Sequence, residues 1–289
     1  MTPRFPVYIP SKSRAEIAMT PDCLDRLGVP FRLIVEEAQH DAYAARYGAG
    51  RLLVLPRSYI DAYDPLMPLG PEESRGSGPA RNFAWDHALS EGHAWHWCMD
   101  DNIRDFHHLT GNVKHYAGDG MIFAAMEDFA TRYLNLGMCG PEYEPMVPAR
   151  QAKPQPFKLN RRVFSCLLIR NDTGLRWRGR YNEDLLLCIA LLRAGWCTVS
   201  FLAFLQKKIA TQRMAGGNTE AFYGAEGTLP KSMLAVKEHP DIVRLVTRYG
   251  RPHHVVDWSE FEGLRLVRDP AWTPPPVNPY RTVTRPRQG

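Results

Sequence analysis

The sequence predicts an α/β fold in which a mostly parallel central sheet is flanked by helices. Two observations lead to this prediction. Short β-rich runs alternate with helical stretches through the first third of the chain, a rhythm typical of βαβ units. Acidic, basic and hydroxyl-bearing residues that could bind a ligand directly follow several of these runs. They therefore fall at the carboxyl ends of strands, where open α/β sheets bind their ligands.

The N-terminal region begins with three short predicted strands and the helices between them. The strands are expected at Val7–Pro10, Phe31–Glu36 and Arg51–Leu55, and the helices at 13–27 and 38–47. Strands separated by helices in this way pair in parallel. The sequence thus predicts one half of a parallel sheet before residue 56.

A long loop and a third helix follow these strands. The segment 56–78 is rich in proline and glycine and lacks apolar periodicity, so we expect a surface loop. Pro79 suits the first turn of a helix over 79–90, whose apolar positions share one face. The strand Ala94–Met99 comes next and leads into the acidic turn Asp100-Asp101-Asn102.

The second half of the chain continues with helices and strands at less regular spacing. The expected elements are a helix that begins after Asp119 and ends near Gly137, a loop at 142–160, and then strand Val163–Arg170, helix Leu185–Leu192 and strand Trp196–Phe204. Asn182 can cap the second of these helices, and Glu183 and Asp184 suit the positive end of its dipole. These elements extend the same α/β pattern.

The domain organisation predicted from this pattern is a single catalytic domain with long loops over 1–268. Its two halves are 1–104 and 105–268. The tail 269–289 is rich in proline and arginine and poor in aliphatic residues. Such a composition favours an extended or disordered segment.

Composition narrows the class of protein only moderately. The formal net charge of +5 fits an ordinary enzyme as well as a nucleic-acid binder. The 6 cysteines form no CxxC pair, so we expect reduced core cysteines rather than disulfides or a zinc ribbon. No apolar run approaches the roughly 18 residues of a membrane span, and the N-terminus lacks a secretory pattern. A cytoplasmic protein is expected.

The acidic turn is the first candidate site. Adjacent carboxylates after a strand suit a hard cation, and Mg²⁺ or Mn²⁺ is usually held by one or two carboxylates together with substrate phosphates. Asp100, Asp101 and Asn102 are therefore candidate metal ligands. The alternative is a structural turn, because Asp and Asn are common loop residues.

Two further motifs suit a nucleotide. In Gly78-Pro79-Ala80-Arg81-Asn82, the arginine can pair with a diphosphate and the asparagine can bond a base or ribose at the helix N-terminus. A solvated first helical turn is the alternative. The first strand ends in polar and basic residues over which a nucleotide can lie, unless they only begin a charged helix. The candidate ligands near these strand ends are Pro10, Ser11, Lys12, Arg14 and Glu36.

The remaining candidates lie later in the chain. Glu183 or Asp184 can act as a general base, although both also suit the helix dipole. The pair Gly216-Gly217, with Asn218 and Lys231, can let backbone approach a ligand closely, but two glycines alone are a weak signal. The last candidate metal ligand is His253, with His254 and His239 as alternatives, and all three can equally be surface histidines.

The order of these motifs resembles that of GT-A-type nucleotide-sugar transferases. In that superfamily a DxD-like turn binds metal and diphosphate, and a Glu-Asp pair before a helix supplies the base. The resemblance implies those roles for the turn 100–102 and for Glu183 and Asp184. The turn departs from the usual pattern because its third residue is Asn102, a weaker ligand. Which of Asp100 and Asp101 contacts the metal therefore stays open.

A closer resemblance is to the phage TET-associated glycosyltransferases, which add sugars to 5-hydroxymethylpyrimidines in DNA. It rests on the motifs YIPSKSR at 8–14, GPARN at 78–82, WCMDDNI at 97–103, NEDLLLC at 182–188, GGNT at 216–219 with KS at 231–232, and GRPHH at 250–254.

This resemblance implies a GT-A-like fold, a Mn²⁺ or Mg²⁺ ion, and a UDP-glucose, UDP-galactose or UDP-GlcNAc donor. It also implies that the half 1–104 binds the nucleotide-sugar and that the half 105–268 receives the acceptor. The implied acceptor is 5-hydroxymethylcytosine in DNA, inside the host cytoplasm if a phage encodes the protein. A base in a duplex must be flipped out to react, and Arg281, Arg285 and Arg287 of the tail can contact phosphates. The alternatives are a protein, glycan or lipid acceptor on the same fold, or a catalytically silent DNA-binding module. The sequence does not indicate the oligomeric state.

Overall fold

The structure is a computed structural model that describes residues 2–147, 155–209, 216, 227, 229–248 and 250–274. Its centre is one large sheet. The strands of this sheet are β1 Val7–Pro10, β2 Arg32–Val35, β3 Leu52–Val54, β4 Trp95–Met99, β5 Ile103–Thr110, β6 Val113–Tyr116, β7 Leu136–Tyr143, β8 Phe157–Leu159, β9 Cys166–Arg170 and β10 Cys197–Lys208. Their order is β3-β2-β1-β4-β9-β7-β10-β5-β6, and β8 pairs with β10.

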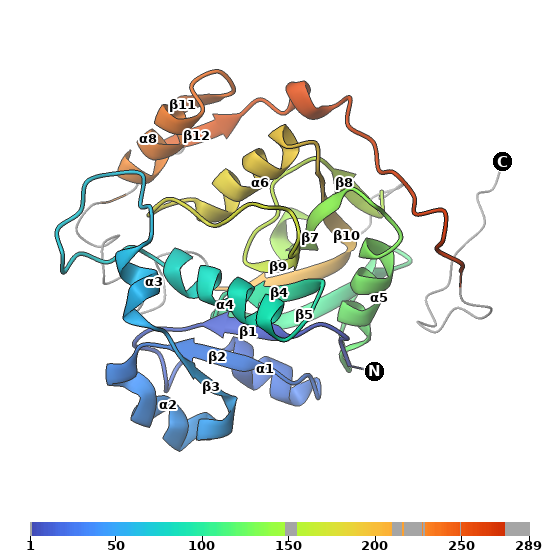
Figure 1. Ribbon diagram of the computed structural model, residues 1–289. Coiled ribbons are helices and arrows are strands. Elements are labelled where there is room, and N and C mark those ends of the chain that lie inside the picture. The colour runs from blue at the N-terminus through green and yellow to red at the C-terminus, as the bar shows by residue number, and fades with distance from the viewer. Residues whose placement is uncertain are drawn as a thin grey trace.

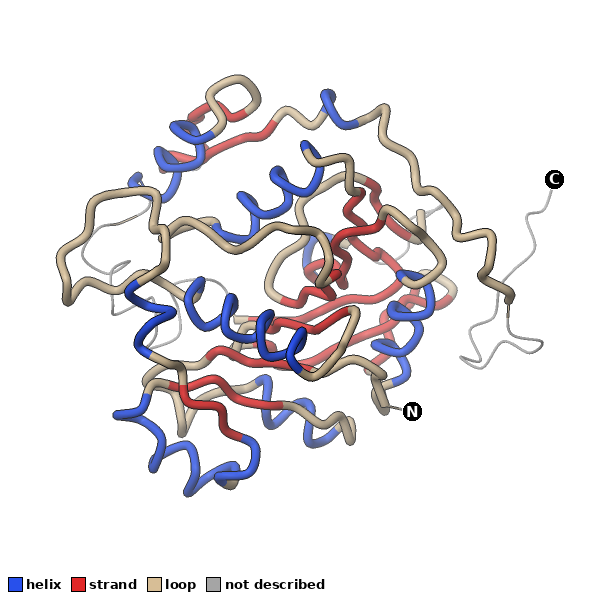
Figure 2. The backbone as a smooth tube through the Cα atoms, in the orientation of Figure 1, coloured by secondary structure: helices blue, strands red, loops and turns tan. Residues whose placement is uncertain are grey.

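Helices cover both faces of this sheet, as Figures 1 and 2 show. The helices are α1 Thr20–Arg26, α2 His40–Tyr47, α3 Arg57–Asp61, α4 Gly78–Ser90, α5 Met121–Ala130, α6 Glu183–Arg193 and α8 Leu229–Glu238. Buried side chains of α1, α2 and α5 share one core cluster, and those of α4 and α6 pack on the opposite face. The predicted α/β class with a helix-flanked sheet is confirmed.

The pairing of the strands sets the position of the strand ends. Strands β3, β2, β1 and β4 are parallel neighbours, with Tyr8 opposite Arg32 and Cys98. Strand β9 then pairs antiparallel with β4 and β7, so the sheet as a whole is mixed. Because β1, β2 and β4 run in the same direction, their carboxyl ends meet at one edge.

Strand β1 shows how the sequence fills both faces. Ile9 packs with the cluster of α1, α2 and α5, whereas Tyr8 faces α4. Successive side chains of a strand point to opposite faces, so a strand covered on both sides is apolar throughout. The buried residues of α4 opposite Tyr8 are alanines, Ala80, Ala84 and Ala88. Their small side chains let the helix lie close to the sheet.

The structure differs from the sequence-based expectations at several elements. The helix predicted over 13–27 begins only at Thr20, because the backbone oxygen of Asp101 accepts bonds from Met19 and Thr20 and holds the preceding segment as a loop. Helix α3 lies inside the predicted loop 56–78. Residues 275–289 of the predicted tail lie outside the described residues.

Several strands were missed, including β8 inside the predicted loop 142–160. The hairpin β5–β6 was not predicted, and neither was β7, which contains glycines that resemble a turn. In β7 those glycines allow close packing instead: a Cβ on Gly140 would lie 2.0 Å from the backbone oxygen of Cys166. Strand β10 continues to Lys208, four residues past the end predicted at Phe204.

A small outer layer covers α6. It consists of α8 and a two-stranded hairpin formed by β11 Val243–Arg248 and β12 Arg251–Val256. Leu185 and Ile189 of α6 pack against Ala235 of α8 and Val243 of β11. Asn182, at the start of α6, also donates a hydrogen bond to the backbone oxygen of Lys231 in the first turn of α8 at 2.7 Å. Figure 1 shows this outer layer beyond α6.

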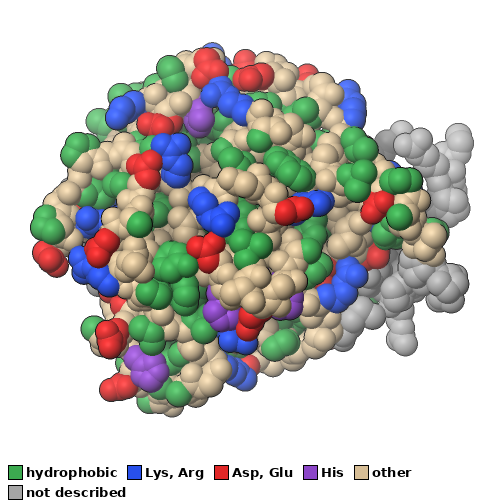
Figure 3. Space-filling view, in the orientation of Figure 1, with side chains coloured by type: hydrophobic (Ala, Val, Ile, Leu, Met, Phe, Trp, Pro, Cys, Tyr) green, Lys and Arg blue, Asp and Glu red, His purple; other side chains and the backbone are tan. Residues whose placement is uncertain are grey.

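Two predictions from composition can be compared with the structure. All six cysteines are buried and free, as expected for reduced core residues. Within the described part of the chain, no helix is long and apolar enough to cross a membrane. On the face drawn in Figure 3, Lys and Arg side chains are interspersed with Asp and Glu.

Stability should depend on pH through His96, which is fully buried in β4. Burial lowers its pKa from 6.5 to about 4, although a hydrogen bond with Asn171 opposes the shift. Because the unfolded chain binds a proton at higher pH than the folded chain, stability is lost as the pH falls from 6.5 to 4. The full loss is about 3 kcal/mol. Urea unfolding at pH 7 and pH 4.5 should show it, and His96→Gln should reduce the pH dependence.

Candidate active site

A cavity of about 760 Å³ opens at the edge where the parallel strands end. Its lining comes from the carboxyl ends of β1, β2 and β4, the N-terminal ends of α4 and α6, and the ends of β7 and β10. The sequence placed four of its candidate motifs at these ends, and the fold brings them together.

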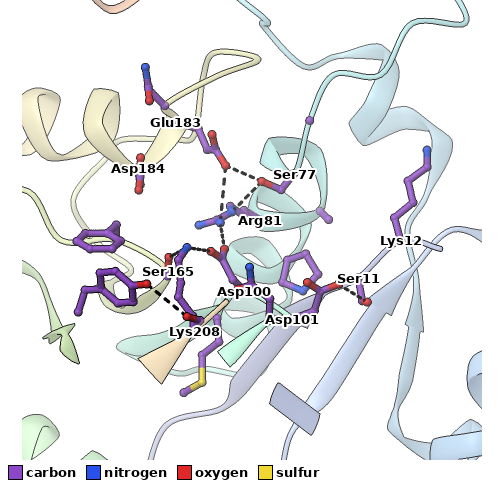
Figure 4. Close-up of a pocket in the computed structure, with 18 of the residues that line it drawn as sticks. Ser11, Lys12, Ser77, Arg81, Asp100, Asp101, Ser165, Glu183, Asp184 and Lys208 are labelled. Atoms are coloured by element: carbon purple, nitrogen blue, oxygen red, sulfur yellow. Dashed lines mark hydrogen bonds and ion pairs between the residues drawn. The ribbon is translucent and has the colours of Figure 1, made fainter. Parts of the chain in front are cut away.

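Asp100 is the acid of the turn that faces this cavity, with a quarter of its side chain exposed. Its Oδ1 accepts a hydrogen bond from Arg81 Nη2 at 2.7 Å, and its Oδ2 accepts one from Lys208 Nζ at 3.2 Å. Burial alone would raise the pKa of Asp100, but Lys208 and Arg81 lower it to about 2. Asp100 is therefore an ionised carboxylate held between two cations (Figure 4).

Asp101 is almost fully buried, and the chain itself uses both of its carboxyl oxygens. Ser11 Oγ donates to Oδ2 at 2.7 Å, and Arg14 Nη1 donates to Oδ1 at 2.6 Å. Burial raises the pKa of Asp101, opposed by Arg14 and Ser11. This carboxylate holds the loop after β1 in place, so Asp100 is the better positioned of the two to meet a ligand.

Replacing Asp101 should act mainly on stability. In Asp101→Asn, the amide cannot accept both bonds and leaves Arg14 buried without its anion. We expect the free energy of unfolding to fall by about 3 kcal/mol, as when a buried ion pair is broken. Urea denaturation measures this loss. Unchanged stability would instead show that the bonds to Asp101 are not structural and would keep Asp101 as a candidate ligand.

Arg81 lies between the two acidic motifs, as Figure 4 shows. Its Nη2 is 2.7 Å from Asp100 Oδ1 and 3.7 Å from Glu183 Oε1, and its Nε donates to Ser77 Oγ at 3.2 Å. The guanidinium stacks over the ring of Trp177, 4.6 Å from its centroid. A buried cation shared in this way fixes Asp100 and Glu183 relative to one another.

Among the described residues, one carboxyl oxygen of Glu183 accepts a hydrogen bond and the other accepts none. Ser77 Oγ donates to its Oε1 at 2.6 Å, and no described residue donates a hydrogen bond to Oε2. The side chain lines the cavity and is 14% exposed. A carboxylate that is oriented but still has a free oxygen can accept a proton from a bound hydroxyl.

Asp184 differs from Glu183 because it is tied to one arginine. Arg162 Nη2 lies 2.8 Å from each carboxyl oxygen, and the backbone N–H of Leu185 donates to Oδ1 at 2.7 Å. Burial would raise its pKa, but Arg162 outweighs burial and lowers it. An anion stabilised in this way is a weak base. Of the two predicted bases, Glu183 has the more suitable geometry.

The predicted nucleotide ligands after β1 and β2 line the outer part of the cavity. Lys12 Nζ forms an ion pair with Glu36 Oε1 at 2.6 Å, and both side chains are more than a third exposed. Pro10, Ser11 and Arg14 also line the cavity. Figure 4 shows Lys12 well apart from the group around Arg81, so the two groups can contact different parts of an extended ligand.

Several predicted ligands do not lie in the described lining. Asn82 exchanges two hydrogen bonds with the backbone of Trp177, at 3.1 and 2.9 Å, which ties α4 to the segment before α6. His239 is 3.2 Å from Arg193. His253 and His254 belong to β12 and do not join the acidic turn. Their predicted roles in ligand or metal binding therefore find no support in the geometry.

The glycine-rich motif is only partly described. Gly216 has a φ of +73°, and a Cβ there would lie 2.4 Å from the backbone oxygen of Ser13. Its own oxygen accepts a bond from Arg14 Nη2 at 2.9 Å. This glycine was expected to let the backbone approach a ligand closely. It approaches the loop after β1 instead. Gly217, Asn218, Arg281, Arg285 and Arg287 lie outside the described residues.

The turn supplies few oxygen ligands for a metal ion. Among the described residues, no group of three His, Cys, Asp or Glu side chains could hold one. Asn102 Oδ1 is buried and has no hydrogen-bond partner, and Asp100 Oδ2 contacts Lys208. One carboxylate and one amide can hold Mn²⁺ or Mg²⁺ only if a ligand's phosphates complete the coordination.

The structure adds site residues that the sequence-based reasoning did not select. They include Ser77, Lys158, Arg161, Arg162, Phe164, Ser165, Lys208 and Trp258. Ser77 and Lys158 lie in segments predicted as loops, where polar residues are common and carry little signal. Phe164 and Ser165 lie in the predicted strand Val163–Arg170. Lys208 was missed because β10 is longer than predicted. The additional residues of the strand place this lysine at the cavity.

The balance of charge in the lining favours an anionic ligand. The described lining contains eight Lys or Arg side chains and six Asp or Glu side chains. One of the cations, Lys231, has a pKa lowered mainly by burial and then by Arg162. With every group ionised, two positive charges remain, enough to compensate a diphosphate in part.

One comparison with known proteins identifies a family. No curated protein matches the chain. A family model described as TET-Associated Glycosyltransferase matches residues 5–217, most of the chain and nearly all of the cavity lining. The chain belongs to the TET-associated glycosyltransferase family.

Proposed function

We propose that this glycosyltransferase moves a sugar from a UDP-sugar to the hydroxymethyl group of 5-hydroxymethylcytosine in DNA. Family membership supports glycosyl transfer. The observation that carries the rest is the arrangement of Asp100 and Glu183, joined by Arg81, in a cavity with an excess of cations. In this arrangement, cationic side chains can bind a diphosphate next to a carboxylate that can accept a proton from the acceptor.

The donor would lie along the ends of the parallel strands. Its nucleoside would contact Lys12 and Glu36, at the outer part of the cavity. Its diphosphate would meet Arg81 and Lys208, the two cations beside Asp100. Cations placed where charge develops on a leaving group stabilise the transition state more than the ground state.

The Mn²⁺ or Mg²⁺ ion expected from the sequence could enter only together with this diphosphate, and only if Lys208 moves away from Asp100 Oδ2. Asp100 and Asn102 would be its protein ligands, and the phosphates would supply the other oxygens. Such an ion would neutralise charge on the departing UDP.

The transfer itself needs a base and room for the acceptor. Glu183 Oε2 would accept the proton of the hydroxymethyl group. At the same time, the hydroxymethyl oxygen would form a bond to the anomeric carbon of the sugar. The bond from that carbon to the diphosphate oxygen breaks, and UDP leaves with the electron pair. General-base assistance of this kind contributes roughly 10²- to 10⁴-fold to a rate.

The acceptor base would be flipped out of the helix to reach this carbon. The lining on the side of β7, β9 and the outer layer contains the aromatic residues Tyr143, Phe164 and Trp258 and the cations Lys158 and Arg161. Aromatic rings can stack on an extruded base, and cations can contact its phosphates. We also propose phosphate contacts by Arg281, Arg285 and Arg287.

A transfer assay tests the proposed function. Radiolabelled UDP-glucose, UDP-galactose and UDP-GlcNAc are each incubated with matched DNAs that contain cytosine or 5-hydroxymethylcytosine. Label should enter only the hydroxymethylated DNA. Transfer to glycan, protein or lipid acceptors instead would retain the enzyme class and refute the DNA acceptor. Tight DNA binding without turnover of any donor would favour a catalytically silent module.

A further inference from the structure

Lys208 is largely buried, although lysine side chains are usually exposed to solvent. It ends β10, and only 10% of its side chain is exposed. Its Nζ donates to Ser165 Oγ at 2.5 Å and to Asp100 Oδ2 at 3.2 Å, and it lies 5.8 Å from the centroid of the Phe164 ring. The strand, the serine and the ring together hold the ammonium group at the acidic turn.

The hydrogen bonds of this ammonium group leave room for a ligand. A lysine has three N–H donors, and the described residues use two of them. Lys208 lines the cavity, so a phosphate oxygen that reaches Asp100 can accept the third. Arg81 lies on the other carboxyl oxygen of Asp100. A diphosphate there would meet two fixed cations from the chain itself.

Lys208 also competes with a divalent ion for the same oxygen. An ion coordinated by Asp100 Oδ2 would come within a few ångströms of Nζ, where two cations repel strongly in a poorly solvated site. Binding the ion would therefore require Lys208 to move away from both Asp100 and Ser165.

We propose that Lys208 is the built-in cation for the donor's diphosphate, so that this protein binds a nucleoside diphosphate without a divalent ion. The proposal rests on the proposed function, because it takes UDP as the relevant ligand. It assigns to one side chain the neutralisation that an ion would otherwise supply.

Calorimetric titration of UDP into the full chain tests this assignment in EDTA and in MnCl₂. For the wild type, the two dissociation constants should agree within about 3-fold. Lys208→Met should weaken binding in EDTA by about 30-fold, the loss expected for a charge-assisted bond to phosphate. MnCl₂ should restore most of this loss, because the substitution frees Asp100 Oδ2. Lys208→Arg should stay independent of the ion.

Lys207→Met is the matched control, since Lys207 is the neighbour on the same strand but does not line the cavity. It should bind UDP like the wild type in both buffers. Mn²⁺ binding without UDP, followed by electron paramagnetic resonance, gives a second readout that needs no turnover. Lys208→Met should bind Mn²⁺ more tightly than the wild type. Thermal unfolding checks that each variant is folded.

The outcomes separate this proposal from the proposed function. Wild-type UDP binding that weakens more than 10-fold in EDTA would overturn the role of Lys208, even if sugar transfer to hydroxymethylated DNA is observed. Equal affinities of Lys208→Met and Lys207→Met for UDP in EDTA would overturn it as well. If the wild type binds no UDP in either buffer, the UDP-sugar donor and the role of Lys208 both fail.

Discussion

Glu183→Gln should lower the rate constant of sugar transfer by about 10³-fold while the protein stays folded. The amide has nearly the same shape as the carboxylate and can still accept the hydrogen bond from Ser77. It cannot take a proton from the acceptor hydroxyl. The measurement is single-turnover transfer from a labelled UDP-sugar at saturating DNA, with UDP affinity measured in parallel. UDP affinity should change by less than about 3-fold, because Glu183 is assigned to the acceptor.

Two neighbouring substitutions are matched controls for Glu183. Ser77→Ala removes the bond to Oε1 but keeps the base, so transfer should fall by less than about 10-fold. Asp184→Asn breaks the pair with Arg162 and should lower stability more than it lowers the rate of the folded protein. If Asp184→Asn abolishes transfer in a folded protein and Glu183→Gln does not, the two acids exchange roles.

Arg81→Met should lower the free energy of unfolding by about 3 to 5 kcal/mol, the cost of breaking a buried ion pair by removing one partner. Arg81 is 4% exposed and is the cation between Asp100 and Glu183. Methionine fills part of the volume against Trp177 but leaves the two carboxylates close together without that cation. For a chain of this size, the melting temperature should fall by roughly 6 to 20 °C.

Differential scanning calorimetry measures this change, and Arg81→Lys is the natural comparison. Lysine keeps the charge but cannot contact Asp100, Glu183 and Ser77 through one planar group. Its melting temperature should lie between those of the wild type and Arg81→Met. A folded Arg81→Met variant with an unchanged melting temperature would show that Arg81 is not the link between the two acidic motifs.

The parallel half of the sheet could be predicted because its signals are local. Strands β1, β2 and β4 are mostly apolar runs followed by polar residues, and Pro79 marks the start of α4. The structure keeps these elements and puts their ends at one cavity. Strand β7 could not be predicted in the same way, because Gly137 and Gly140 resemble a turn until neighbouring side chains and backbone fill the space beside them.

The sequence by itself determined the α/β class, the acidic turn at the end of a buried strand, and the Glu-Asp pair before an apolar helix. Each depends on hydrophobic periodicity or on residues adjacent in the chain. Only the tertiary structure distinguished the members of these motifs. Asp100 faces the cavity while Ser11 and Arg14 occupy Asp101, and Glu183 keeps a free oxygen while Arg162 occupies Asp184.

The partners that make these distinctions come from distant parts of the chain. Lys208 lies 108 positions from Asp100, and Arg14 lies 87 positions from Asp101. No local pattern encodes such a contact, because it depends on which strands pair and how far each one extends. The sequence indicated several residues that could do the chemistry. The folded structure decided which of them remain free to do it, and it added Lys208.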